Sequence, residues 1–181
     1  MINCKHLCMM LMLALCTLTA QAQEAELIRN GDFELNPRVE RGTSATTVWD
    51  GPKPVVVVHV DPISADNPNY AVICCDTIYN VGFDGIPVVE GAKYDFSVSL
   101  RHIPALKEEE RTCGHKLLII QLVDEQRKPL AEATIRAKGC HWQKYETTFT
   151  ANAASVKARL AIIGIGCQKI AIDKVSLKKH E

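Results

Sequence analysis

One stretch of the sequence alternates apolar and polar residues without a break. Residues 94–101 read Tyr-Asp-Phe-Ser-Val-Ser-Leu-Arg. Successive side chains of a β-strand point to opposite faces, so this pattern predicts a strand with one buried face. We therefore expect Tyr94, Phe96, Val98 and Leu100 to lie in a core.

Further segments are rich in β-branched and aromatic residues, which favour strands. These segments are 55–60, 70–75, 116–123, 142–150, 156–165 and 170–177. The β-branched run 55–60 suits a strand that is buried on both faces. Turn-forming residues separate the segments, as in Asp-Gly-Pro at 50–52 and Asp-Asn-Pro-Asn at 66–69. Many short strands with turn signals between them predict an all-β fold, an antiparallel β-sandwich.

The charge balance limits the classes of binding partner that the sequence predicts. Lys+Arg and Asp+Glu are both 21, so the formal net charge is zero. A chain without excess positive charge has no electrostatic footprint for nucleic acid or for an anionic membrane surface. We therefore expect no nucleic-acid partner, and neutral ligands suit such a surface.

The N-terminus has the pattern of an export signal. Lys5 and His6 precede an apolar run of about 14 residues, too short to span a bilayer comfortably. Residues 20–22, Ala-Gln-Ala, match the small-x-small pattern of a cleavage site. We predict a cleaved signal peptide over residues 1–22, one domain over 23–181, no membrane span, and a secreted or periplasmic protein.

Export affects how the cysteines are interpreted. The mature chain would keep an odd number, so at least one stays a thiol or pairs with another chain. These cysteines are Cys74, Cys75, Cys113, Cys140 and Cys167. The first two are adjacent on an expected strand, which would turn their side chains to opposite faces. The sequence leaves the pairing open.

Two sets of motifs carry a family resemblance. Residues 30–34 (Asn-Gly-Asp-Phe-Glu) and 172–177 (Ile-Asp-Lys-Val-Ser-Leu) resemble the opening and closing motifs of galactose-binding-like jelly rolls, the fold of many carbohydrate-binding modules. The segments between them resemble the N-terminal module of family 51 α-L-arabinofuranosidases. They are 67–71, 79–86, 91–94 and 142–151. The resemblance implies a jelly-roll sandwich and covers nearly all of the mature chain.

The resemblance does not extend to the catalytic part of those enzymes. They continue into a (β/α)₈ barrel that carries two catalytic glutamates, and a barrel needs about 250 residues. Retaining hydrolysis requires two carboxylates about 5 Å apart, and no motif here places two in that way. We expect a non-catalytic module that binds arabinose-containing plant polysaccharide or oligosaccharide, with a glycoside hydrolase catalytic domain as a possible partner. The alternative is a structural or interaction domain of a truncated or split glycoside hydrolase, with no sugar binding of its own.

The resemblance also implies a structural calcium ion. Related modules use a backbone carbonyl and a glutamate of the opening motif and an aspartate of the closing strand. Here these are Asp32 (its carbonyl), Glu34 and Asp173. Calcium takes six to eight oxygen ligands, so carboxylates and carbonyls are suitable donors. The alternative is that these acids only cap turns.

Sugar recognition needs aromatic rings and polar groups on an exposed face. Trp49, Tyr79 and Phe83 lie in or near expected loops, although Phe83 could instead fill the core. Arg101 and Gln121 are polar positions on otherwise apolar strands, so we expect them to project from the concave sheet. We take these five residues as candidate ligand-binding residues.

Overall fold

The computed structural model describes residues 25–35, 48–51, 56–103, 116–166 and 169–181. The predicted signal peptide lies outside these ranges. The described elements are all strands: β1 Trp49–Asp50, β2 Val56–Val58, β3 Tyr70–Ile73, β4 Thr77–Asn80, β5 Ile86–Val88, β6 Lys93–Ile103, β7 Lys116–Val123, β8 Pro129–Ala137, β9 Gln143–Thr150, β10 Ser155–Ile165 and β11 Lys169–Lys179. Within the described residue ranges, no helix is long and apolar enough to cross a membrane.

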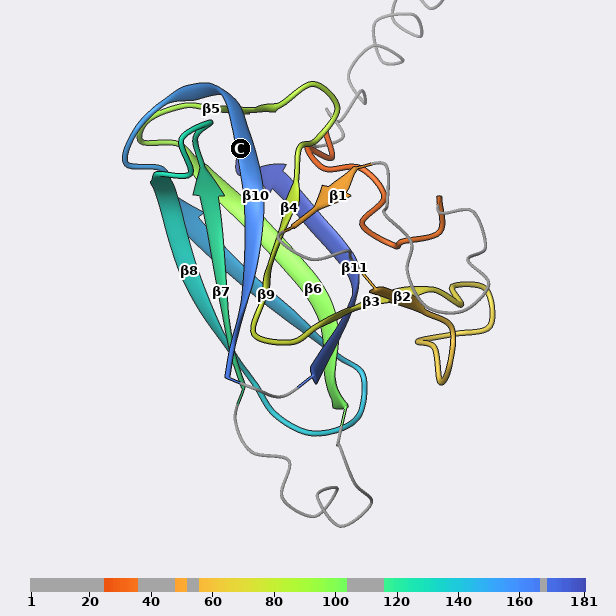
Figure 1. Cartoon of the computed structure of the whole chain (residues 1–181). Helices are drawn as coiled ribbons and strands as arrows, with labels where there is room; N and C mark the ends of the chain where they lie inside the picture. Colours follow the sequence, from red (N-terminus) through yellow and green to blue (C-terminus); the bar gives the residue numbers. More distant parts are fainter. Residues whose placement is uncertain (1–24, 36–47, 52–55, 104–115, 167–168) are drawn as a thin grey trace, which may run out of the picture.

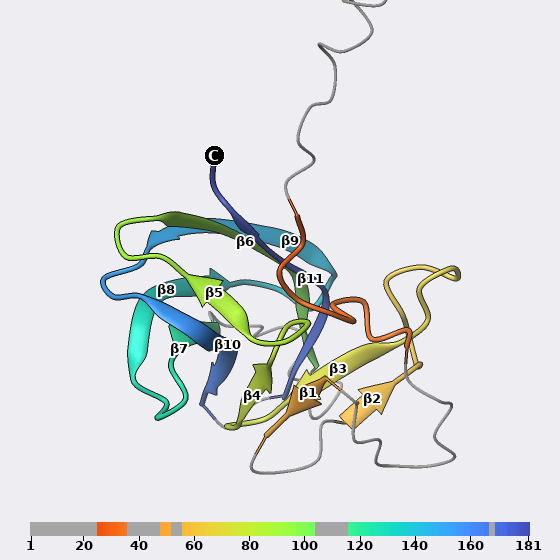
Figure 2. The same cartoon turned by 90° about the horizontal axis from the view of Figure 1, so that it is seen from above.

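The strands form two antiparallel sheets. The six-stranded sheet has the order β1-β4-β10-β7-β8, and β5 pairs with the other end of β10. The five-stranded sheet has the order β2-β3-β11-β6-β9. Figures 1 and 2 show the two sheets stacked as layers, with β6, β9 and β11 in one and β7, β8 and β10 in the other. The expected all-β antiparallel sandwich is confirmed.

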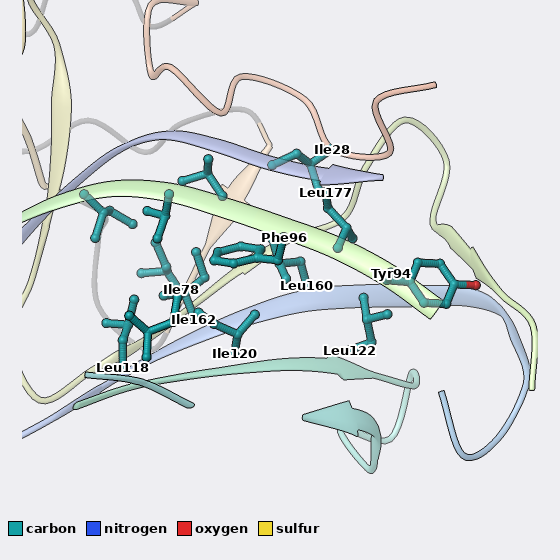
Figure 3. Packing of buried hydrophobic residues seen from close by; sticks show 14 of the residues in the cluster. Ile28, Ile78, Tyr94, Phe96, Leu118, Ile120, Leu122, Leu160, Ile162 and Leu177 are labelled. Carbon is teal, nitrogen blue, oxygen red and sulfur yellow. The ribbon is translucent and has the colours of Figure 1, made fainter. Parts of the chain in front are cut away.

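The core lies between the sheets. In β6 the side chains of Tyr94, Phe96, Val98 and Leu100 are at most 1% exposed, which confirms the prediction from the alternating pattern. The facing sheet contributes inward side chains from alternate positions of β7 and β10, which Figure 3 shows meeting those of β6. They are Leu118, Ile120, Leu122, Leu160 and Ile162. Burying a side chain of this size contributes roughly 1.5–3 kcal/mol relative to exposure.

The N-terminal segment 25–35 is held against β11. The Leu27 amide donates to the Leu177 carbonyl at 2.9 Å, and the Val175 amide donates to the Gly31 carbonyl at 2.9 Å. A Cβ atom on Gly31 would lie 1.9 Å from the Val175 carbonyl oxygen, so this close approach requires glycine. The opening and closing motifs are thus side by side.

Some strands differ from the sequence expectation. β8 was not predicted, because its alanines and its glutamate have low β-propensity. β2 is an edge strand, and its described side chains, Val57 and Val58, are half-buried rather than buried on both faces. β1, β4 and β5 are short and were also missed.

The cysteines also differ from expectation. Cys74 and Cys75 follow β3 in a bend instead of continuing the strand, and Cys75 has a positive φ of 52°. The Cys75 thiol lies 2.6 Å from the Gly166 carbonyl oxygen. Cys140 is disulfide-bonded. Cys113 and Cys167 lie outside the described residues.

Candidate functional site

The outer side of the six-stranded sheet, which we call the six-stranded face, carries both polar side chains and apolar ones such as Ile119 and Ile163. In β7 and β10 the inward residues Leu122 and Leu160 are fully buried. Their chain neighbours Gln121 and Ala161 therefore point outward, because side chains alternate along a strand. The same alternation places Tyr79 of β4 outward, next to the inward Ile78.

One row of residues crosses the six-stranded face. Asp50 pairs with Tyr79, Tyr79 with Ala161, Ala161 with Gln121, and Gln121 with Glu132. The Gln121 amide donates to the Glu132 carboxylate at 2.6 Å. Adjacent strands lie about 4.8 Å apart, so the backbones of Tyr79 and Gln121 are roughly 10 Å apart with Ala161 between them. An aromatic ring and an amide–carboxylate pair thus flank Ala161, which is itself only 1% exposed.

Arg127 reaches Tyr79 from the β7–β8 turn. Its guanidinium carbon lies 5.3 Å from the centre of the Tyr79 ring, although β10 lies between β7 and β4 in the sheet. Asp124 holds this turn: its carboxylate accepts from the Lys128 amide at 2.8 Å, and its carbonyl accepts from the Arg127 amide at 3.0 Å. Arg127 has a positive φ of 66° there.

The structure brings two of the five predicted ligand-binding residues together. Tyr79 and Gln121 share the row described above, although Tyr79 lies on a strand and not in a loop. Glu132 and Arg127 are also part of this face, and neither was predicted from the sequence. Glu132 could be found only through its pairing with Gln121, and strand register is not readable from one sequence.

Arg101 lies on the opposite side of the molecule, on the outer side of the five-stranded sheet. It is 8% exposed, and its guanidinium forms a salt bridge of 3.0 Å with Asp61. The rings of Tyr70 and Trp142 lie 5.5 and 5.3 Å from its guanidinium carbon. Arg101 therefore fixes the 59–62 loop and does not form one site with Gln121.

The other two predicted aromatic residues, Trp49 and Phe83, lie outside the Tyr79 row. Trp49 is 2% exposed: it stacks on Phe33 at 5.1 Å, and its indole N–H donates to the Asn30 carbonyl at 2.8 Å. Its expected role as an exposed ring is wrong, because it anchors the N-terminal segment in the core. Phe83 is 61% exposed, so it does not fill the core. It lies in the turn after β4, with the Arg29 guanidinium 5.5 Å from its ring centre.

The outer side of the five-stranded sheet has a shallow groove of about 480 Å³, with a polar lining and no tyrosine or tryptophan. Its lining residues are Asp95, Phe96, Ser97, Lys144, Glu146, Thr147, Thr148, Ser176 and Lys178. The hydrogen bond from Thr148, and next that from His180, lowers the pKa of Asp95. Without an aromatic platform on its outward side, this groove is a weaker candidate for sugar than the six-stranded face.

The three predicted calcium ligands gather where the opening motif meets β11. Asp173 is fully buried and accepts hydrogen bonds from the Asn67 side chain and, at 2.6 Å, from the Lys174 amide. The pKa of Asp173 is raised to about 7: burial is the main cause, the hydrogen bond and charge of Lys174 oppose it, and the carboxylates of Glu34 and Asp32 add to it.

Glu34 is tied to the loop before β3. Its two carboxylate oxygens accept from the backbone amide and the side-chain amide of Asn69 at 2.8 and 2.7 Å. The carboxylates of Glu34 and Asp173 are oxygen donors of the kind that calcium takes, although N–H groups of Asn67, Asn69 and Lys174 already bond to them. Among the described residues, however, no three His, Cys, Asp or Glu side chains are grouped closely enough to hold a metal by themselves.

Several known proteins are similar to this chain in sequence or in fold. The chain is 31% identical over 157 residues to an extracellular exo-α-L-arabinofuranosidase of Streptomyces chartreusis, and the match covers 84% of this chain but 17% of that enzyme. The fold matches arabinose-bound MgGH51 α-L-arabinofuranosidase with a TM-score of 0.73 at 18% identity, over 86% of this chain and 26% of that one. It matches a family 16 carbohydrate-binding module with a TM-score of 0.51 at 12% identity, over 83% of this chain and 98% of that one.

No protein-family model matches the sequence. The chain spans about a sixth of the Streptomyces enzyme and about a quarter of the solved arabinofuranosidase. The resemblance read from the sequence motifs is confirmed: this chain is similar in sequence to a segment of an α-L-arabinofuranosidase and in fold to part of a family 51 enzyme, and it has the jelly-roll fold that carbohydrate-binding modules share.

Proposed function

We propose that this protein is a secreted, non-catalytic module that binds arabinose-containing plant polysaccharide through the six-stranded face. The observation that carries the proposal is the row in which Tyr79 and Gln121 flank Ala161. The similarity to a segment of an extracellular arabinofuranosidase supports both the substrate class and secretion. A glycoside hydrolase catalytic domain is the partner that this similarity suggests.

The chemistry of the row suits a sugar. The C–H side of a sugar ring packs on an aromatic ring, while its hydroxyls exchange hydrogen bonds with planar amide and carboxylate groups. Tyr79 supplies the ring, and the Gln121–Glu132 pair supplies donors and acceptors on the far side of Ala161. These groups stand on strands of one sheet, with β10 between β4 and β7, so the sheet holds them at fixed spacing.

The same row argues against glycosidase chemistry on this face. Its two acids, Asp50 and Glu132, stand on the two edge strands, four strand spacings apart, or roughly 19 Å between backbones. Glycosidases hold their two carboxyl groups about 5–5.5 Å apart when retaining and about 6.5–9.5 Å apart when inverting. A binding role fits this spacing, and a two-carboxylate mechanism does not.

Calorimetry and affinity gels with arabinan and arabinoxylan test the proposal. Wild-type protein should bind, whereas Tyr79→Ala and Gln121→Ala should each weaken binding about tenfold or more, because each removes one side of the row. Gln143→Ala is the matched control, since Gln143 lies on β9 of the other sheet. Absence of binding to every plant polysaccharide would instead favour a structural or interaction domain.

We also propose that a calcium ion joins the opening motif to β11 through Glu34, Asp173 and the Asp32 carbonyl. The buried Asp173 carboxylate, close to two other acids, supports a cation at this position, since a divalent ion would neutralise their repulsion. The ion would bind the folded state alone and stabilise it by about 2.7 kcal/mol at a hundredfold excess over its Kd. The melting temperature should therefore rise with calcium in the wild type and stay nearly unchanged in Asp173→Ala. Equal melting with calcium and with chelator would contradict the ion.

A further inference from the structure

We infer that the six-stranded face takes a carboxylate-bearing glycan, that is, a polysaccharide with uronic acid groups, through Arg127 and Arg159. This inference rests on the proposed sugar binding and specifies its ligand class. It follows from two arginines at one end of the face, neither of which forms a salt bridge with another described residue.

The two arginines lie at the same end of the face. Arg159 lies on β10, two residues before Ala161, and therefore points outward like Ala161. It pairs with Val123, the last residue of β7, and Arg127 follows in the next turn. The guanidinium of Arg127 extends over Tyr79. A ligand on Tyr79 would thus contact the guanidinium of Arg127 directly. The guanidinium of Arg159 would lie about two residues further along β10.

Neither arginine is neutralised by the described part of the protein. Within those ranges, neither Arg127 nor Arg159 is in a salt bridge. Three nearby acids make other contacts: Asp124 accepts from the Lys128 amide, Glu132 from Gln121 and Asp50 from the Gly51 amide. Glu125, in the same turn as Arg127, forms no salt bridge with another described residue. Lys157, two residues before Arg159 on β10, is exposed and adds a further cation. The positive charges here are therefore available to a ligand.

A carboxylate is the sugar substituent that these side chains fit. Guanidinium groups bind carboxylates through paired, charge-assisted hydrogen bonds. Neutral sugar hydroxyls do not require them. The contact of Arg127 with the Tyr79 ring is weak enough at a solvated site for a carboxylate to compete for the guanidinium.

The test compares two forms of one polymer: an arabinoxylan with glucuronic acid groups, and the same polymer after reduction of its carboxyl groups to alcohols. Wild-type protein should bind the acidic form about 10- to 100-fold more tightly, the range expected for a charge-assisted hydrogen-bond pair. This preference should shrink as salt increases, because exposed charges are screened. In Arg127→Gln and Arg159→Gln the ratio of the two affinities should fall toward one.

Arg136→Gln is the matched control, because Arg136 lies on β8 at the opposite end of the same sheet, paired with Leu117. It should keep the wild-type ratio. Equal binding of the two polymers by the wild type would overturn the inference and leave the proposed sugar binding intact. Binding of neither polymer would overturn both. A preference that persists in Arg127→Gln and Arg159→Gln but is lost in Arg136→Gln would overturn the assignment to these two arginines.

Discussion

Gly31 shows how one residue allows the two ends of the fold to meet. Its backbone lies so close to β11 that any Cβ would collide with the Val175 carbonyl oxygen. From the sequence alone, the Asn-Gly-Asp stretch around it is interpreted as a turn and as part of a family motif. The structure shows in addition a packing reason for the glycine.

Gly31→Ala should therefore destabilise the protein, by about 2–4 kcal/mol, because the backbone must move apart to admit the methyl group. Gly91→Ala is the control: Gly91 has a φ of 78°, but a Cβ atom added to it would meet nothing within 4 Å. That change should cost only about 1 kcal/mol of backbone strain. Urea unfolding of both variants measures the difference, and equal losses would contradict the collision.

Asp173 should make stability depend on pH when calcium is absent. Its folded-state pKa of about 7 lies above its ordinary value of 3.8, so the folded protein binds this proton more tightly than the unfolded chain does. The free energy of unfolding should therefore rise as pH falls through 7 toward 4, and the gain should be absent above pH 7. In chelator, the wild type should lose stability from pH 5 to pH 8 relative to Asp173→Asn. A constant difference between the two across this range would contradict the raised pKa.

At the scale of elements, the alternating pattern of β6 was sufficient to predict both the strand and its buried face. β7, β9, β10 and β11 were also predicted within about two residues of their ends, because their apolar residues alternate or run continuously. β8 was missed, since three of its four inward positions, Ala131, Ala133 and Ala137, are alanines and only Ile135 is β-branched. Its burial is decided by pairing with β7, a contact that local sequence does not encode.

A buried and an exposed residue of β10 should respond differently to truncation. Leu160→Ala removes a fully buried side chain and should cost about 2–5 kcal/mol, from lost burial and the cavity left behind. Val156→Ala, on the same strand but 83% exposed, should change stability by less than about 0.5 kcal/mol. Denaturant unfolding of the two variants provides the measurement, and similar losses would place β10 differently in the sandwich.

At the scale of the whole molecule, the sandwich has two unlike outer faces. One carries the Tyr79 row with its arginines, and the other carries a polar groove and the Arg101 cluster. Residue type selects Tyr79 and Gln121 from the sequence together with Arg101 and Trp49, which the structure places on the other outer face and in the core. Which face a strand residue occupies depends on sheet assignment and register, and neither is visible in the sequence.

The purified protein should not hydrolyse a chromogenic arabinofuranoside, because the two acids of the Tyr79 row, Asp50 and Glu132, are too far apart for a two-carboxylate mechanism. The measurement is release of the chromophore over hours, with an intact arabinofuranosidase as the positive control. Turnover that disappears on mutation of a single carboxylate of this chain would contradict the non-catalytic role.

NMR titration of labelled protein with an arabinoxylan oligosaccharide tests most directly whether glycan binds on the six-stranded face. Amide shifts should change for Tyr79, Gln121, Glu132 and Ala161 and saturate together. Residues of the opposite groove, such as Ser97 and Glu146, should stay unchanged. Shifts confined to that groove, or no shifts with any plant oligosaccharide, would contradict the account.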